Sequence, residues 1–150
     1  MLDFDYSKHF ADIVQTISWD IKLPEDWSDF FEQSGVAPQI GPERRGNQRR
    51  LVRVRGLMCF DQPLPSIERE QRLFGVYTKD FSKKSCGLVS PIELYPEEEV
   101  RLILPTFRLK LRVAAARRRS QNCYEIGLIL LNRFDPDRSA FISGGHFLKV

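Results

Sequence analysis

Residues 108–113 alternate strictly between basic and apolar side chains, and this pattern constrains the fold more than any other part of the sequence. One parity is apolar and the other basic: Leu109, Leu111 and Val113 against Arg108, Lys110 and Arg112. Successive side chains of a β-strand point to opposite faces, so a period of two predicts a strand with one buried and one solvated face. Such strands are typical of antiparallel sheets.

Further segments show the composition of short strands at fairly regular spacing. They are residues 52–60, 73–78, 86–89, 100–104 and 124–131. In the first, Val52, Val54, Met58 and Phe60 share one parity, and Arg53 and Arg55 share the other. Six or so such strands predict a mainly β protein built as an antiparallel barrel or sandwich.

The N-terminal part predicts helices. Apolar residues recur at three- and four-residue steps, namely Phe10, Ile13, Val14, Ile17 and Ile21, and Asp5 or Ser7 is placed to cap the start. Pro24 opens a second helix with Trp27, Phe30 and Phe31 on one face, and Gly35 ends it. Two interpretations stay open: these helices cover the core, or they dock a partner. At the other end, residues 135–137 can start a short C-terminal helix that Gly144 and Gly145 stop early.

Composition excludes several classes of protein. No apolar run approaches the roughly 18 residues that span a bilayer, and the acidic N-terminus is unlike a secretory signal. Three widely spaced cysteines (Cys59, Cys86, Cys123) argue against a disulfide framework or a zinc site. With only two histidines, and with no nucleophile–base pair, we expect no metal, no cofactor and no enzymatic activity. The chain is expected to be a soluble cytoplasmic protein.

Charge is distributed unevenly along the chain. The net charge is +3, yet residues 1–43 hold two lysines against nine acidic residues, and residues 44–150 hold 21 basic residues against 11 acidic ones. Arginine supplies 16 of the 23 basic residues. Because the guanidinium group forms paired hydrogen bonds to phosphates and to base edges, this composition indicates recognition of such groups.

Six of these arginines lie within residues 44–55, and no acidic residue interrupts them. Arg45 and Arg49 are four apart at a loop-to-strand junction that follows Gly41 and Pro42. A loop bearing several guanidinium groups can wrap a compact dianion and contact the O6/N7 edge of guanine. The alternative is a solvated basic strand edge that discourages aggregation.

A second feature lies at residues 77–88. Asp80 and Ser82 flank a single residue, so in an extended chain both side chains point the same way. A carboxylate there can accept from the N1 and N2 donors of a guanine, and Gly87 permits a close approach. Taken alone, Asp-x-Ser is also typical of an ordinary turn.

The two features together resemble the PilZ domain. An Arg-Arg-x-x-x-Arg motif is followed by a strand, a loop, an Asp-x-Ser motif and a Gly-Leu pair; the matching residues are Arg44, Arg45, Arg49, Asp80, Ser82, Gly87 and Leu88. Ser85 stands where the second motif has its final glycine. The pairing Arg49 and Arg53 also satisfies the arginine spacing, but we prefer the loop arginines, because the pleat of a regular strand would fix the direction of Arg53. The resemblance covers about residues 42–134.

This resemblance implies a six-stranded antiparallel barrel that binds cyclic di-GMP, a bacterial second messenger. The arginine loop would wrap the ligand and the Asp-x-Ser edge would hold a guanine, which makes Arg44, Arg45, Arg49, Asp80, Ser82, Ser85 and Gly87 the expected ligand-binding residues. The barrel domain would span residues 42–150, with a short C-terminal helix. Residues 1–41 would form an acidic helical extension with a linker.

The expected function is therefore that of a receptor, which changes conformation on binding cyclic di-GMP and relays the signal to a protein partner. The N-terminal helices or the ligand-bound face would contact that partner. Two alternatives remain: a degenerate PilZ-like interaction module without ligand, and a basic β-barrel that binds single-stranded nucleic acid. The second is disfavoured, because the basic strands interleave with Leu, Val and Ala rather than with exposed aromatics.

Overall fold

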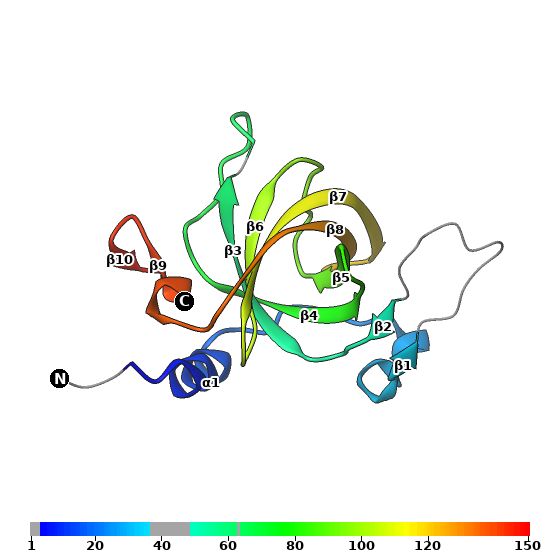
Figure 1. The fold of residues 1–150 in the computed structure, drawn as a ribbon. Helices are drawn as coiled ribbons and strands as arrows, with labels where there is room; N and C mark the ends of the chain where they lie inside the picture. The colour runs from blue at the N-terminus through cyan, green and yellow to red at the C-terminus, as the bar shows by residue number, and fades with distance from the viewer. Residues whose placement is uncertain (1–3, 37–48, 63) are drawn as a thin grey trace.

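A computed structural model of the chain describes residues 4–36, 49–62 and 64–150. Six antiparallel strands of the described residues close into a barrel in the order β4-β3-β6-β7-β8-β5, because β5 pairs back onto β4 (Figure 1). Their bounds are β3 Arg55–Gln62, β4 Phe74–Phe81, β5 Ser85–Ser90, β6 Glu99–Ile103, β7 Arg108–Ser120 and β8 Cys123–Phe134. A mainly β fold with a closed six-stranded antiparallel barrel is thus confirmed.

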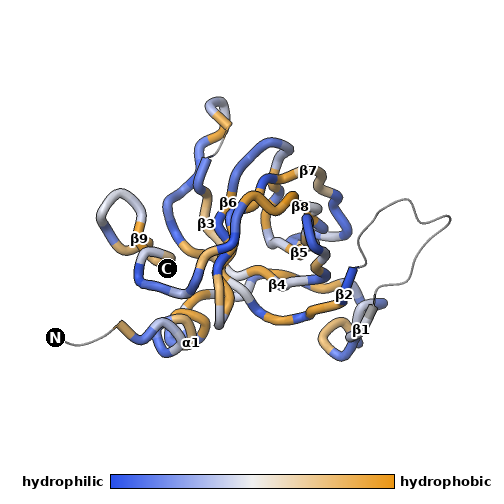
Figure 2. Tube along the Cα trace, viewed as in Figure 1, coloured by the Kyte–Doolittle hydropathy of each residue, from blue (hydrophilic) through white to orange (hydrophobic). Residues whose placement is uncertain are grey.

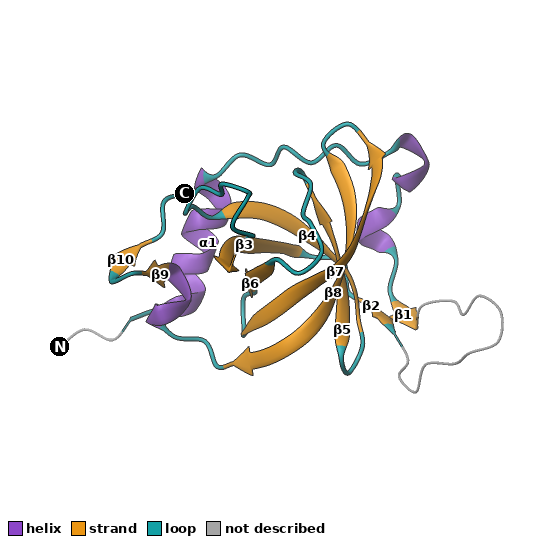
Figure 3. Ribbon diagram, turned by 90° about the horizontal axis from the view of Figure 1, so that it is seen from above, coloured by secondary structure: helices purple, strands orange, loops and turns teal. Residues whose placement is uncertain are grey.

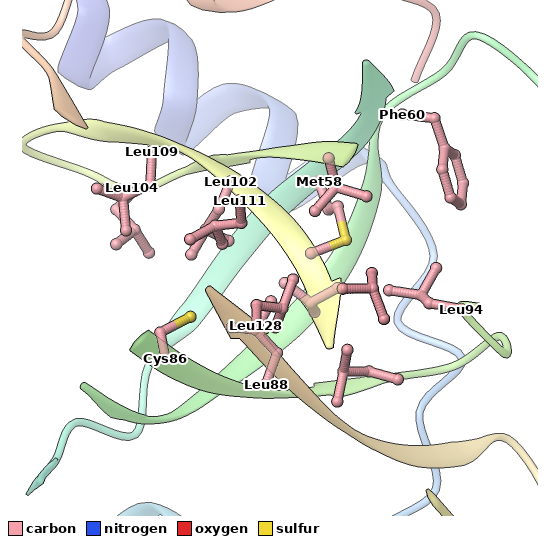
Figure 4. Close-up of a cluster of buried hydrophobic side chains, with 14 residues drawn as sticks. Met58, Phe60, Cys86, Leu88, Leu94, Leu102, Leu104, Leu109, Leu111 and Leu128 are labelled. Atoms are coloured by element: carbon pink, nitrogen blue, oxygen red, sulfur yellow. The ribbon is translucent and has the colours of Figure 1, made fainter. Parts of the chain in front are cut away.

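The alternation of residues 108–113 is realised in β7. Its apolar parity is buried in the barrel interior, where Leu109, Leu111 and Val113 are at most 4% exposed. The basic parity remains partly exposed on the outside. Figure 4 shows the interior cluster, to which all six barrel strands contribute side chains. The alternation alone was sufficient to predict this part of β7, because each of its side chains faces either the barrel interior or solvent.

Strand β3, in contrast, is buried on both faces. Met58 and Phe60 point into the barrel, and Leu57 and Cys59 contact a second cluster outside it. That second cluster is formed by the apolar face of helix α1 (Tyr6–Thr16) together with the C-terminal segment. Figure 2 shows the apolar residues of α1 facing the barrel. Helix α1 therefore covers part of the core, as one of the two interpretations expected.

The predicted second helix is replaced by two short 3-10 turns, η1 (Glu25–Trp27) and η2 (Phe30–Glu32). Ser28 and Asp29 interrupt the segment, since both residue types favour turns over helix interiors. Tertiary packing then fixes the turns, because Phe30 is only 2% exposed and belongs to a third cluster on the outer face of β4 and β5. Figure 3 shows α1 and the pair of turns at different sides of the barrel.

The expected strand over residues 52–60 is also wrong in its first half. Strand β2 (Arg50–Leu51), which pairs with β1 (Gly35–Val36) and β4, ends before β3 begins, and Val52 and Val54 are exposed. The cause is Thr78 on β4, whose Oγ accepts from the Val54 amide at 2.9 Å and donates to the Val52 carbonyl. Backbone hydrogen bonds to β4 persist beside it, from the Val52 amide to the Lys79 carbonyl at 3.2 Å and from the Thr78 amide to the Val54 carbonyl at 2.8 Å. The Thr78 hydroxyl inserted between them makes the pairing irregular, and the alternation of the two valines between buried and exposed faces is lost.

The C-terminal segment contains the 3-10 turn η3 (Arg138–Phe141), capped by Asp137, whose carboxylate accepts from the Ser139 amide at 2.8 Å. A hairpin of β9 (Ile142–Ser143) and β10 (His146–Phe147) follows. Arg101 fixes this segment to the barrel by donating to the carbonyls of Ala140 and Ile142, both at 3.1 Å. The expected short C-terminal helix is therefore a single turn.

None of the helices in the described part of the chain has the length and apolar character needed to cross a membrane.

Candidate ligand-binding site

A row of side chains with little bulk crosses four strands on the outside of the barrel. Asp80 on β4 is paired with Gly87 on β5, Gly87 with Gly127 on β8, and Gly127 with Ala115 on β7. The residues beside them point inward, as the burial of Cys86, Leu88, Ile126 and Leu128 shows. We call Gly87, Gly127 and Ala115 the small-residue floor, and Asp80 stands at one end of it.

Asp80 lies directly over Gly87. A Cβ atom added to Gly87 would be 2.9 Å from Asp80 Oδ1 and 3.3 Å from Oδ2. The glycine therefore provides the space that the carboxylate occupies. In this position Asp80 is only 6% exposed, although it lies on the outer face of the sheet. The other end of the small-residue floor, at Gly127 and Ala115, is exposed to solvent.

Arg49 is the cation that accompanies Asp80. Its Nη1 lies 3.5 Å from Asp80 Oδ1, which is the long limit of a hydrogen-bonded ion pair. Arg49 Nε is buried and has no hydrogen-bond partner in the described part of the chain. An ionised carboxylate offers about four acceptor sites, and the described residues fill only one of these on Asp80. Both groups thus keep unused hydrogen-bonding capacity.

Ser82 and Ser85 lie at the hairpin between β4 and β5. The Ser82 amide donates to the Ser85 carbonyl at 2.9 Å, and the two hydroxyl oxygens are 2.7 Å apart. Ser85 begins β5, and the described non-glycine residues with positive φ are Glu97 and Asn122. The backbone at Ser85 is therefore one that any residue adopts, and serine in place of the motif glycine is not strained.

The sequence-predicted residues fall into three groups. Asp80, Gly87 and Arg49 come together at one place. Ser82 and Ser85 contact each other at the adjoining β4–β5 hairpin. Arg44 and Arg45 lie outside the described residues.

The prediction that Arg53 belongs to a regular strand is wrong, because Arg53 lies in the break between β2 and β3. Its Nε donates to the Lys79 carbonyl at 2.9 Å, and its guanidinium lies over the ring of Phe30 at 4.2 Å from the centroid.

Sequence reasoning missed the contribution of β7 and β8. Gly127 and Ala115 complete the floor. Glycine and alanine are uncommon in the middle of strands, so their occurrence in segments with strand periodicity was the sequence feature that could have indicated them. Two exposed or half-exposed arginines on β7, Arg112 and Arg117, are paired with Ile129 and Glu125 beside the floor. Which strands lie next to each other could not be read from the chain alone.

The cysteines contribute no reactive group. Burial raises the pKa of the Cys86 thiol, which lies on the interior side next to Asp80, and nearby Asp80 raises it further. Burial likewise raises the pKa of the Cys59 thiol to about 12. In the described ranges, no cluster of three or more His, Cys, Asp or Glu residues is arranged to hold a metal ion.

No family model matches the chain, and searches of curated proteins and of solved structures found no match.

Proposed function

We propose that this protein is a cytoplasmic PilZ-type receptor for cyclic di-GMP and not an enzyme. The ligand lies on the small-residue floor, and Asp80 accepts hydrogen bonds from the N1 and N2 donors of one guanine. Arg49 binds the phosphates together with Arg44 and Arg45. Ser82 and Ser85 provide hydroxyl groups at the edge of the site.

One observation carries this proposal: a nearly buried carboxylate with unfilled acceptor sites next to an arginine with an unfilled donor. Burying a charged group without full hydrogen bonding costs free energy, and a ligand that supplies the missing partners recovers it. Guanine presents two adjacent donors, which suit one carboxylate, and the phosphate oxygens suit the guanidinium. Cyclic di-GMP offers both in one molecule.

The shape and charge of the surroundings support the same ligand. Gly127 and Ala115 carry no side chain beyond Cβ, so a planar base can approach the sheet closely. Arg112 and Arg117 border this surface on β7, and their charges favour a dianion.

Arg53 provides a route from the site to the N-terminal segment. It contacts the carbonyl of Lys79, the residue next to Asp80, and it packs on Phe30 of η2. A ligand that displaces β4 changes these contacts, which biases the position of residues 19–33. The acidic N-terminal extension, residues 1–41, then provides the surface that a protein partner binds, while residues 42–150 form the receptor domain.

Calorimetric titration with cyclic di-GMP tests the proposal, with GTP as the competing nucleotide. We expect saturable binding to the wild type and at least about tenfold weaker binding to Asp80→Asn and to Arg49→Ala, since each removes a charge-assisted hydrogen bond. Arg138→Ala is the matched control, because Arg138 is an exposed arginine of η3 that packs on Phe147. Its affinity should equal that of the wild type.

The absence of binding to folded wild-type protein would contradict the proposal, as would equal affinity for GTP. The contact between the Ser82 and Ser85 hydroxyls supports the second candidate, a degenerate interaction module, since it occupies one hydrogen-bonding group of the motif. That candidate predicts no heat of binding with cyclic di-GMP for any variant.

A further inference from the structure

A separate pocket of about 200 Å³ lies between the two 3-10 turns and the outer face of the barrel. The turns provide Trp27 and Phe30, and the barrel side provides Arg53, Lys79, Arg119 and Glu125. Pockets for drug-sized ligands usually measure about 300–1,000 Å³. A pocket of this size therefore suits a single ring with one substituent.

The charged side chains of the pocket do not balance. Three are basic, and Glu125 is the one acidic side chain in the lining. Glu125 pairs with two of them, at 3.5 Å from Lys79 Nζ and 3.0 Å from Arg119 Nε. The third, Arg53, has no carboxylate within ion-pair distance in the described part of the chain. The lining thus carries an excess of two positive charges, which favours an anion.

Arg53 is positioned to bind such an anion. Its Nε donates to the Lys79 carbonyl at 2.9 Å and its Nη1 to the Phe30 carbonyl at 3.4 Å, which leaves three of the five guanidinium N–H groups without an acceptor among the described residues. Desolvation lowers the pKa of Arg53, and the negative charges of Asp80, Asp29 and Glu125 oppose this shift only in part. A guanidinium desolvated in this way gains most from a bound anion.

The aromatic side chains give the pocket a preference for a ring. Trp27 and Phe30 are stacked with an interplanar angle of 16°, and guanidinium groups lie over both rings: Arg53 over Phe30 and Arg119 over Trp27. A ring inserted here contacts an aromatic wall, and an attached anionic group reaches the arginines.

We propose that this pocket binds a single-ring aromatic anion, that is, an aryl phosphate or aryl carboxylate. The site is distinct from the small-residue floor, and the proposal does not depend on cyclic di-GMP binding. Because the pocket lies between the N-terminal turns and the barrel, such a ligand also holds the two together.

Titration of isotope-labelled full-length protein with phenyl phosphate, followed by NMR, tests this. We expect saturable shifts of the Trp27 indole signal. Trp19 is an internal reference, because its indole donates to the Val14 carbonyl at 2.9 Å and lies outside this pocket. Inorganic phosphate and benzyl alcohol, each lacking one half of the probe, should bind at least about tenfold more weakly.

Two variants of opposite expected effect make the test specific. Arg53→Gln should weaken phenyl phosphate binding about tenfold or more, and Glu125→Gln should strengthen it severalfold, because it removes the one acidic side chain of the pocket. The Glu125 variant guards against the case in which the Arg53 variant displaces Phe30. Arg55→Gln is the matched control, since Arg55 lies over Trp19 instead. No saturable shift at Trp27, equal binding of benzyl alcohol or inorganic phosphate, or weaker binding to Glu125→Gln would overturn the proposal.

Discussion

Asp80 occupies the most confined position of the candidate site, and its confinement depends on one missing methyl group. Gly87 on the neighbouring strand leaves the space in which the carboxylate lies, and the added Cβ would be 2.9 Å from Oδ1. At Gly127, by contrast, the nearest contact of an added Cβ is the Ala115 carbonyl at 4.0 Å. Two glycines that are paired across the same strands therefore differ in what they tolerate.

We expect Gly87→Ala to lower the free energy of unfolding by about 1–3 kcal/mol, because the methyl group displaces a nearly buried carboxylate. Gly127→Ala, at the paired position, should change it by less than about 0.5 kcal/mol. Chemical denaturation of both variants measures the difference. Equal stability of the two would show that Asp80 moves aside freely, and the close packing of Asp80 on Gly87 would then contribute no stability.

At the scale of single elements, the start of α1 is defined by its cap. The Asp5 carboxylate accepts from the Lys8 amide at 3.0 Å, which satisfies one of the free amides of the first turn. Asp5→Ala should therefore cost about 1 kcal/mol of stability. Ser7→Ala is the control, since Ser7 lies within the helix and is exposed. A larger effect at Ser7 than at Asp5 in thermal unfolding would contradict this assignment.

Elements were predictable from sequence where each side chain meets one environment only. The alternation in β7 is of this kind, and so is the burial of α1 through Phe10 and Ile13. Prediction failed where a residue distant in the sequence determines the local backbone conformation. The Thr78 hydroxyl makes the pairing at residues 52–54 irregular from more than twenty positions away. The burial of Phe30 against Tyr77 shapes the turns that replace the expected helix.

At the scale of the whole molecule, one buried ion pair ties the long β3–β4 connection to the start of β6. Glu98 is fully buried and accepts from Arg69 through two nitrogens, at 2.9 and 2.8 Å, and from the Tyr95 amide at 2.8 Å. The Arg69 guanidinium also lies over the ring of Phe60. Phe60 belongs to the interior cluster, so this arrangement packs against the barrel core.

Glu98→Gln should lower the free energy of unfolding by about 3–5 kcal/mol, because it leaves the buried guanidinium without its carboxylate. Glu97→Gln changes the adjacent residue in the same way, but that side chain is 74% exposed and 3.9 Å from Arg112. It should be nearly neutral. If urea denaturation gave the two variants similar stability, the pair would not be what ties the β3–β4 connection to the start of β6.

The candidate site was predictable from sequence only as separate parts. The motif residues Asp80 and Gly87 were found from their spacing, but their contact depends on the pairing of β4 with β5. The floor could not be foreseen, since Gly127 and Ala115 join it through strand pairings that close the barrel. Adjacency across a closed sheet is a property of the whole molecule, and no local pattern encodes it.

The most direct test of the central claim is an NMR map of the wild-type protein titrated with cyclic di-GMP. If the ligand lies on the small-residue floor, the largest amide shifts will be at Asp80, Gly87, Gly127 and Ala115, and those of α1 and the β9–β10 hairpin will change little. Shifts concentrated at α1 or that hairpin, or no shifts at saturating ligand, would contradict the account.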